Sequence, residues 1–190
     1  MTKLGLVIVS VAAVACGKGD KAGAAATPMD VAGVNALVPA DLEDKLVFEE
    51  TKIPEERGRH KTIYTVAAPK GWKQEMGGFA SLKPPTDLGF MTRFEVGTNC
   101  DGTCEPKDWD KAIDHVYASY LSGKVIKNDK GPGKRTIVAE ASNGDVLVLV
   151  AHWKDGDSRY AHCGGTLDAQ IKGAAAAFEK ACESVIVTEE

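Results

Sequence analysis

Five cysteines carry the clearest chemistry in this chain, because a thiol can be acylated, oxidised to a disulfide or bound to a metal. The first of them, Cys16, stands at the end of an apolar run that follows Lys3 and covers residues 4–15. A positive start, a short apolar core and small residues before the cleavage site are typical of an export signal. The sequence therefore predicts a signal peptide over residues 1–15, removed by cleavage in front of Cys16.

The residues Ala13-Val14-Ala15-Cys16 resemble the bacterial lipobox, in which a small or aliphatic triplet precedes a cysteine that receives diacylglycerol on its sulfur. Ala13 departs from the leucine usual in that family, so secretory cleavage without lipid and an uncleaved anchor stay open as alternatives. A helix over the apolar run would measure roughly 18 Å, which is well short of a hydrocarbon core of about 30 Å. The resemblance implies attachment of a cell-envelope protein to the membrane through its N-terminal lipid. Gly17, in place of an aspartate, favours the outer membrane, facing the periplasm.

The other cysteines form an even set once Cys16 is assigned to lipid: Cys100, Cys104, Cys163 and Cys182. Exported proteins fold in an oxidising compartment, where cysteines pair. Four cysteines allow three pairings. The sequence favours a bridge between Cys100 and Cys104 across a short loop, and one between Cys163 and Cys182 that joins a strand to a helix.

The alternative use of these side chains is a metal site formed by His152, His162 and Cys163, with the two histidines as cross-strand neighbours. Their spacing matches no common zinc motif, so we expect neither a metal nor another cofactor. The sequence also contains no nucleophile-elbow, zinc-protease, Walker or dinucleotide-binding motif. We therefore expect a non-catalytic module. The alternative is an envelope enzyme, a hydrolase or a metal-dependent one, with a dispersed site around His152 and His162.

Charge argues against a polyanionic partner. The chain has 23 basic and 27 acidic residues, so removal of Lys3 with the signal leaves 22 against 27, a net charge of −5. The basic residues are scattered among the acidic ones, which is unlike a nucleic-acid-binding surface. Residues 16–35 are rich in Gly and Ala and read as the lipidated cysteine and a flexible tether. Residues 36–190 are long enough for one domain.

The apolar pattern of that domain predicts short strands and two helices. A helix is predicted over about 106–121, where six apolar residues fall on one stripe at helical spacing: Trp109, Ile113, Val116, Tyr117, Tyr120 and Leu121. A second helix is predicted over about 168–184. Strands are predicted near 46–53, 62–67, 79–82, 90–96, 135–141, 146–153 and 159–163. The strand over 146–153 is apolar without alternation, so we expect both of its faces to be covered.

This order of elements, with the segment YTVAAPKGW and the ending FEKACESVIV, resembles the PsbP-like family. The resemblance covers about residues 46–187 and implies an α/β fold of the α+β type. In that fold an antiparallel sheet of about six to seven strands carries helices on both faces. It also implies a binding or accessory module, with an envelope protein or a small ligand as its partner and no nucleic acid.

Overall fold

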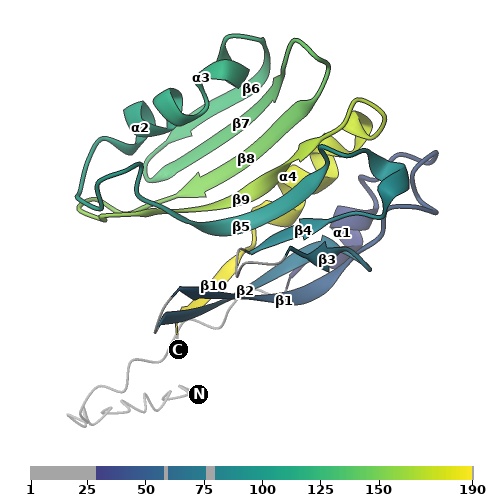
Figure 1. Ribbon diagram of the computed structural model, residues 1–190, viewed down its shortest axis with the longest axis horizontal. Coiled ribbons are helices and arrows are strands. Elements are labelled where there is room, and N and C mark those ends of the chain that lie inside the picture. Colours follow the sequence, from purple (N-terminus) through teal and green to yellow (C-terminus); the bar gives the residue numbers. More distant parts are fainter. Residues whose placement is uncertain (1–28, 58–59, 76–79, 190) are drawn as a thin grey trace, which may run out of the picture.

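The computed structural model describes residues 29–57, 60–75 and 80–189, and these form two antiparallel sheets with few helices. The smaller sheet has the strand order β1-β2-β10, and the larger one has seven strands in the order β3-β4-β5-β9-β8-β7-β6. Figure 1 shows helix α4 between the two sheets and helices α2 and α3 beside the larger one. The predicted α+β class is confirmed, whereas the strands expected in one sheet are divided between two.

The smaller sheet consists of β1 (Phe48–Arg57), β2 (His60–Pro69) and β10 (Ile186–Glu189). The larger sheet consists of β3 (Lys73–Gln74), β4 (Ser81–Lys83), β5 (Arg93–Asn99), β6 (Lys124–Gly131), β7 (Lys134–Glu140), β8 (Val146–His152) and β9 (Tyr160–Leu167). The helices are α1 (Val31–Asn35), α2 (Trp109–Val116), α3 (Ala118–Leu121) and α4 (Ala175–Cys182). Two 3-10 turns, η1 (Thr86–Leu88) and η2 (Lys172–Ala174), complete the list.

Strand β8 is buried on both faces, as its continuous apolar run predicts. Its even-numbered residues from Val146 to Val150 belong to one hydrophobic core, and its odd-numbered residues from Leu147 to Ala151 belong to another. Because side chains alternate along a strand, the two sets point to opposite faces of the larger sheet. The sheet therefore separates two cores, and β8 contributes to both.

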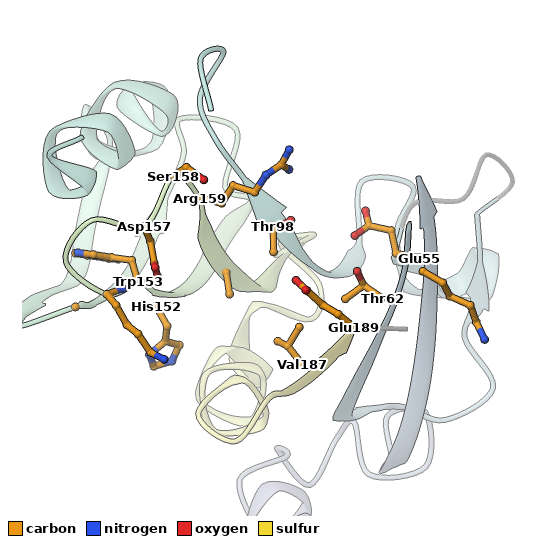
Figure 2. A pocket seen from close by; sticks show the side chains of 14 residues that line it. Glu55, Thr62, Thr98, His152, Trp153, Asp157, Ser158, Arg159, Val187 and Glu189 are labelled. Atoms are coloured by element: carbon orange, nitrogen blue, oxygen red, sulfur yellow. Dashed lines mark hydrogen bonds between the residues drawn. The ribbon is translucent and has the colours of Figure 1, made fainter. Parts of the chain in front are cut away.

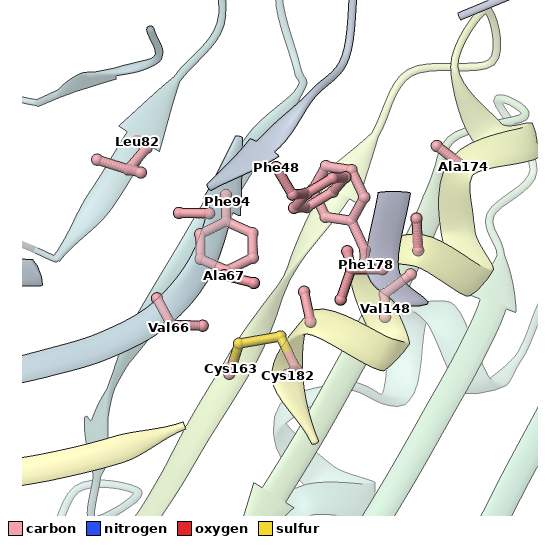
Figure 3. Packing of buried hydrophobic residues seen from close by; sticks show 14 of the residues in the cluster. Phe48, Val66, Ala67, Leu82, Phe94, Val148, Cys163, Ala174, Phe178 and Cys182 are labelled. Carbon is pink, nitrogen blue, oxygen red and sulfur yellow. A yellow bond between two sulfur atoms is a disulfide. The ribbon is translucent and has the colours of Figure 1, made fainter. Parts of the chain in front are cut away.

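The first core lies between the two sheets and is organised around Phe178 of α4. Its ring centroid is 5.3 Å from that of Phe48 on β1 and 5.8 Å from that of Phe94 on β5. Trp72, which follows β2, packs on the same ring at 5.9 Å. Figure 3 shows Phe178 between the strands of the two sheets. One side chain thus joins aromatic residues of both sheets through α4.

A disulfide between Cys163 of β9 and Cys182 of α4 closes one end of this core. Both cysteines are buried, and α4 ends at Cys182, so the bridge ties the last helical residue to the larger sheet. A link of this length removes chain entropy from the unfolded state, by about 3 kcal/mol in the loop-closure estimate. The pairing favoured by the sequence is present here and also at Cys100 and Cys104.

The second core lies on the other face of the larger sheet, under α2. Trp109 and Ile113 of this helix pack on β7 and β8, and the Trp109 ring lies 5.3 Å from that of Tyr160 on β9. The fully buried Arg135 of β7 fixes the helix further. Its guanidinium donates hydrogen bonds to Asp110 at 2.8 Å and to Asp114 at 2.5 Å. Packing and charge together hold α2 on the sheet.

Both predicted helices are shorter than their apolar stripes suggest. Asp108, rather than a residue near 106, caps α2 and accepts a hydrogen bond from the Lys111 amide at 3.3 Å. The non-helical backbone of Tyr117 (φ −104°, ψ 20°) separates α2 from α3. The predicted helix over 168–184 is reduced to α4 and a preceding 3-10 turn. Among the described residues, no helix combines the length and apolarity needed to cross a bilayer.

The predicted tether over 16–35 extends too far, because α1 belongs to the folded domain. Val34 is 1% exposed and lies in the first core, and Met29 and Val31 pack against the same core. The side chain of Asn35 also exchanges two hydrogen bonds with the backbone of Phe48 on β1. The sequence hides this helix because it is only five residues long and follows a Gly- and Ala-rich segment.

Two strands longer than two residues, β6 and β10, are absent from the sequence-based prediction, as is the two-residue β3. Each lies at the edge of its sheet, and most of their residues are exposed. Edge strands exposed on both faces lack the alternation of apolar and polar residues by which strands are recognised. Their position was therefore set by pairing with β7 and β2, which the local sequence does not reveal.

The central position of Phe178 gives a stability prediction. Phe178→Ala removes a fully buried ring from between the two sheets, and we expect the free energy of unfolding to fall by about 3–5 kcal/mol. Phe90→Ala is the matched control because the Phe90 side chain is 88% exposed, and it should change stability by less than about 0.5 kcal/mol. Denaturant unfolding of both variants measures the difference, and similar midpoints would contradict the role assigned to Phe178.

Candidate functional site

A cleft opens where the first core ends. It has a volume of about 1120 Å³ and lies between the smaller sheet and one end of the larger one. We call it the inter-sheet cleft; Figure 2 shows its lining, which comes from both sheets and from the β8–β9 loop. The lining residues are Glu55, Lys61, Thr62, Thr98, Gly133, His152, Trp153, Lys154, Asp157, Ser158, Arg159, Ala161, Val187 and Glu189.

The strand register explains why this region is open and polar. In the smaller sheet, Ile53 and Tyr64 are paired and buried, and the next inward pair along the same strands is Glu55 with Thr62. In the larger sheet, the next inward residue of β9 from Cys163 toward the cleft is Ala161, which is paired with His152. The inward rows thus change from apolar to small or polar just beyond the Cys163–Cys182 bridge. The cleft is the uncovered continuation of the inter-sheet core.

Charged groups of both signs line both walls of the cleft. Glu55, Lys61 and Glu189 are on the smaller sheet, and Lys154, Asp157 and Arg159 are on or beside the β8–β9 loop of the larger one. Figure 2 shows Arg159 on the other side of the cleft from Glu55 and Glu189. The buried Glu55 accepts a hydrogen bond from the Tyr64 hydroxyl at 2.7 Å, which fixes its carboxylate. Such a lining suits a polar ligand or a partner segment that carries charge.

The second core positions the β8–β9 loop at the mouth of the cleft. The indole Nε1 of Trp109 donates a hydrogen bond to the backbone oxygen of Asp157 at 3.0 Å. The Asp157 carboxylate in turn accepts one from the Lys154 amide at 2.7 Å, so the turn is closed at both ends. Helix α2 on one face of the sheet therefore holds a cleft-lining loop in place.

The two histidines of the predicted metal site lie on opposite faces of the larger sheet. His152 is paired with Ala161, and His162 with Ala151, which is an offset of one residue. Because an offset of one reverses the side-chain direction, His152 faces the cleft and His162 faces the second core. Cys163 is oxidised in the bridge to Cys182. The structure thus does not bring the predicted ligands together, and the described residues contain no metal-binding group of three or more such side chains.

Cys16 lies outside the described residues. The second bridge, Cys100–Cys104, closes the loop between β5 and α2, and Lys107 Nζ donates hydrogen bonds to the Cys100 and Asp101 carbonyls at 3.1 Å. The sulfur pair and the lysine thus fix the same short loop. This arrangement gives Cys100 and Cys104 a structural role at the entry to α2.

A smaller hollow of about 570 Å³ lies along β5 and contains a second group of ionisable side chains. Burial raises the pKa of Glu95, and the attraction of Arg93, whose guanidinium is 3.5 Å from the carboxylate, offsets this shift in part. His162 lines this hollow and not the inter-sheet cleft. Glu55 and Thr98 line both hollows, so the two adjoin. The larger cleft is the better candidate because all three strands of the smaller sheet contribute to its lining.

Sequence reasoning identified His152 but missed the other side chains of the cleft. Glu55, Thr98 and Glu189 come from three strands far apart in the chain, and no motif links them. The one local signal was the Asp155-Gly156 turn, which predicts the hairpin that carries Asp157. No family model matches the sequence, and no curated protein gives a significant match.

The position of His152 gives a prediction about its charge. Burial, with a further contribution from the nearby Lys134, lowers the pKa of this imidazole from its ordinary value of 6.5. We expect its ring protons to titrate below pH 6.5 in an NMR titration assigned with a His152→Gln variant. Lys134→Met should raise the midpoint without restoring 6.5, because the burial remains. A midpoint at or above 6.5 would contradict this environment.

Proposed function

We propose that this chain is a lipid-anchored, non-catalytic binding module of the bacterial cell envelope, and that its inter-sheet cleft receives an envelope protein or a small ligand. The observation that carries the proposal is the pairing of all four cysteines in the described domain. Cys16 is the only other cysteine in the sequence, so it is the one thiol left for lipid. The small residues in front of it supply the processing site.

The distance from Cys16 to the domain fits this anchoring. Residues 17–28 separate the cysteine from the first described residue, Met29. Twelve residues of Gly- and Ala-rich chain have a root-mean-square span of about 20 Å. Such a tether would hold the domain near the headgroups while leaving the cleft open to partners in the periplasm. We assign the protein to the outer membrane because Gly17, not aspartate, follows the cysteine.

The fold supports a PsbP-like α/β/α sandwich as the architecture of the module. Residues of α2 share a core with one face of β8, and residues of α4 share a core with the other face. This arrangement matches the helix-covered antiparallel sheet that the family resemblance implies. The smaller sheet departs from the single sheet that the resemblance implies, because it packs beyond α4 and supplies the second wall of the cleft.

Acylation of Cys16 tests the anchor directly. Cells fed an alkyne-bearing fatty acid should label the protein, and the mature N-terminus should be found by mass spectrometry at residue 16 with its acyl groups. Cys16→Ser should abolish the label, whereas the control Cys104→Ser should retain it because Cys104 is bonded to Cys100 within the domain. An unmodified Cys16 in the mature protein would refute the proposal.

A further inference from the structure

Strand β10 presents an unused edge at the cleft. It pairs with β2 through Ile186–Glu189, and among the described residues it has no strand on its other side. Val187 and Glu189 line the cleft, and Figure 2 shows both residues on the side of the smaller sheet toward His152 of the larger one. An unpaired edge offers backbone N–H and C=O groups to any extended segment that reaches it. The cleft therefore contains a backbone template as well as charged side chains.

The two longest free edges of the described sheets, β1 and β6, carry features that hinder pairing and that β10 lacks. Strand β1 carries Pro54 near its middle, and proline cannot donate to a ladder of hydrogen bonds. Strand β6 has a register shift between Val125 and Lys127 and several lysines along its length. Bulges, prolines and lysines are among the devices by which proteins prevent pairing at an edge, as are short strands and inward-pointing charges. β10 is four residues long and has no bulge, proline or lysine, and its one charged residue, Glu189, calls for a group of opposite charge on an added strand.

The strand register shows which side chains would neighbour those of a strand added to β10. Glu55, Thr62 and Glu189 form one inward row across the three strands, and Ile53, Tyr64 and Val187 form the next. A residue added opposite Glu189 would continue the first row, and a residue added opposite Val187 would continue the second. Opposite charges and matched apolar groups stabilise such cross-strand neighbours. The first position therefore favours a basic side chain and the second an apolar one.

We infer that β10 receives an extended segment of a partner protein by strand addition, with a basic residue opposite Glu189 and an apolar residue two positions away opposite Val187. This inference rests on the proposed binding function and names the class of partner. Backbone hydrogen bonds to β10 supply the affinity, and the inward side chains supply the specificity. A second copy of β10 fits less well, because it contains no basic residue to place opposite Glu189.

Two labelled peptides test the inference and report the strand direction. Acetyl-Thr-Lys-Thr-Val-Thr-amide places Lys and Val correctly for antiparallel addition, and the reversed sequence does so for parallel addition. Each is titrated by fluorescence polarisation against the full acylated protein purified from membranes in detergent. We expect one of them to bind. N-methylation of the peptide amides that face β10 should abolish binding, because it removes the backbone donors.

Exchanging the charges of Glu189 and the peptide lysine tests their pairing, and Glu183→Lys is the matched control. Glu189→Lys should weaken binding of the Lys peptide about tenfold, and replacing the peptide Lys by Glu should restore it. Glu183→Lys makes the same charge change at the end of α4, outside the cleft lining, and should leave binding unchanged. Equal effects of the two variants would overturn the inference.

Amide hydrogen exchange of the bound protein distinguishes strand addition at β10 from binding elsewhere in the cleft. Alternate amides of an edge strand point away from its partner, so bound peptide should protect about two amides in the fragment that contains β10. Protection of the β8–β9 loop without β10 would leave the cleft as a binding site and refute strand addition. Binding of neither peptide, or pairing of β10 with a second copy, would also refute it.

Discussion

The rest of this structure depends on the insertion of α4 between the two sheets. Phe178 contacts aromatic residues that belong to both sheets, and the Cys163–Cys182 bridge fixes the end of the helix to β9. Without this helix, the apolar inner faces of β2 and β5 would have little to hold them at a common distance. The hydrophobic interior ends where α4 ends, and the chain then turns into β10. The same helix therefore closes the core and defines where the cleft begins.

The cleft offers a ligand two kinds of polar contact, from side chains and from backbone groups. Its inward rows carry charged and hydroxyl side chains, and β10 adds backbone groups that have no partner among the described residues. The second core contributes from the opposite face of the sheet, because Trp109 holds the loop at Asp157. Residues of both sheets thus line the inter-sheet cleft, and packing in both cores holds that lining in place. A lipid on Cys16 would place the cleft close to a membrane, where other anchored proteins are concentrated.

The sequence allowed the local features to be predicted and left the long-range ones hidden. The apolar run of β8, the turns around it and the preferred cysteine pairs are local or depend on parity, and the structure contains them. The composition of the smaller sheet was hidden, because its third strand, β10, pairs with β2 more than 100 residues away and has no pattern of its own. The histidines show how sensitive a site is to register. A cross-strand metal site would need His152 and His162 to pair directly with each other. Each is instead paired with the residue next to the other, so the two side chains lie on opposite faces of the sheet.

Site-specific photo-crosslinking in living cells tests most directly whether the cleft is where this protein binds. A photoreactive residue at Thr98, in the cleft lining, is compared with one at the exposed Lys111 of α2 on the other face of the larger sheet. We expect a discrete adduct from position 98 in the membrane fraction, lost when Cys16 is replaced by serine, and no such adduct from position 111. Equal adducts from both positions, or none from position 98, would contradict it.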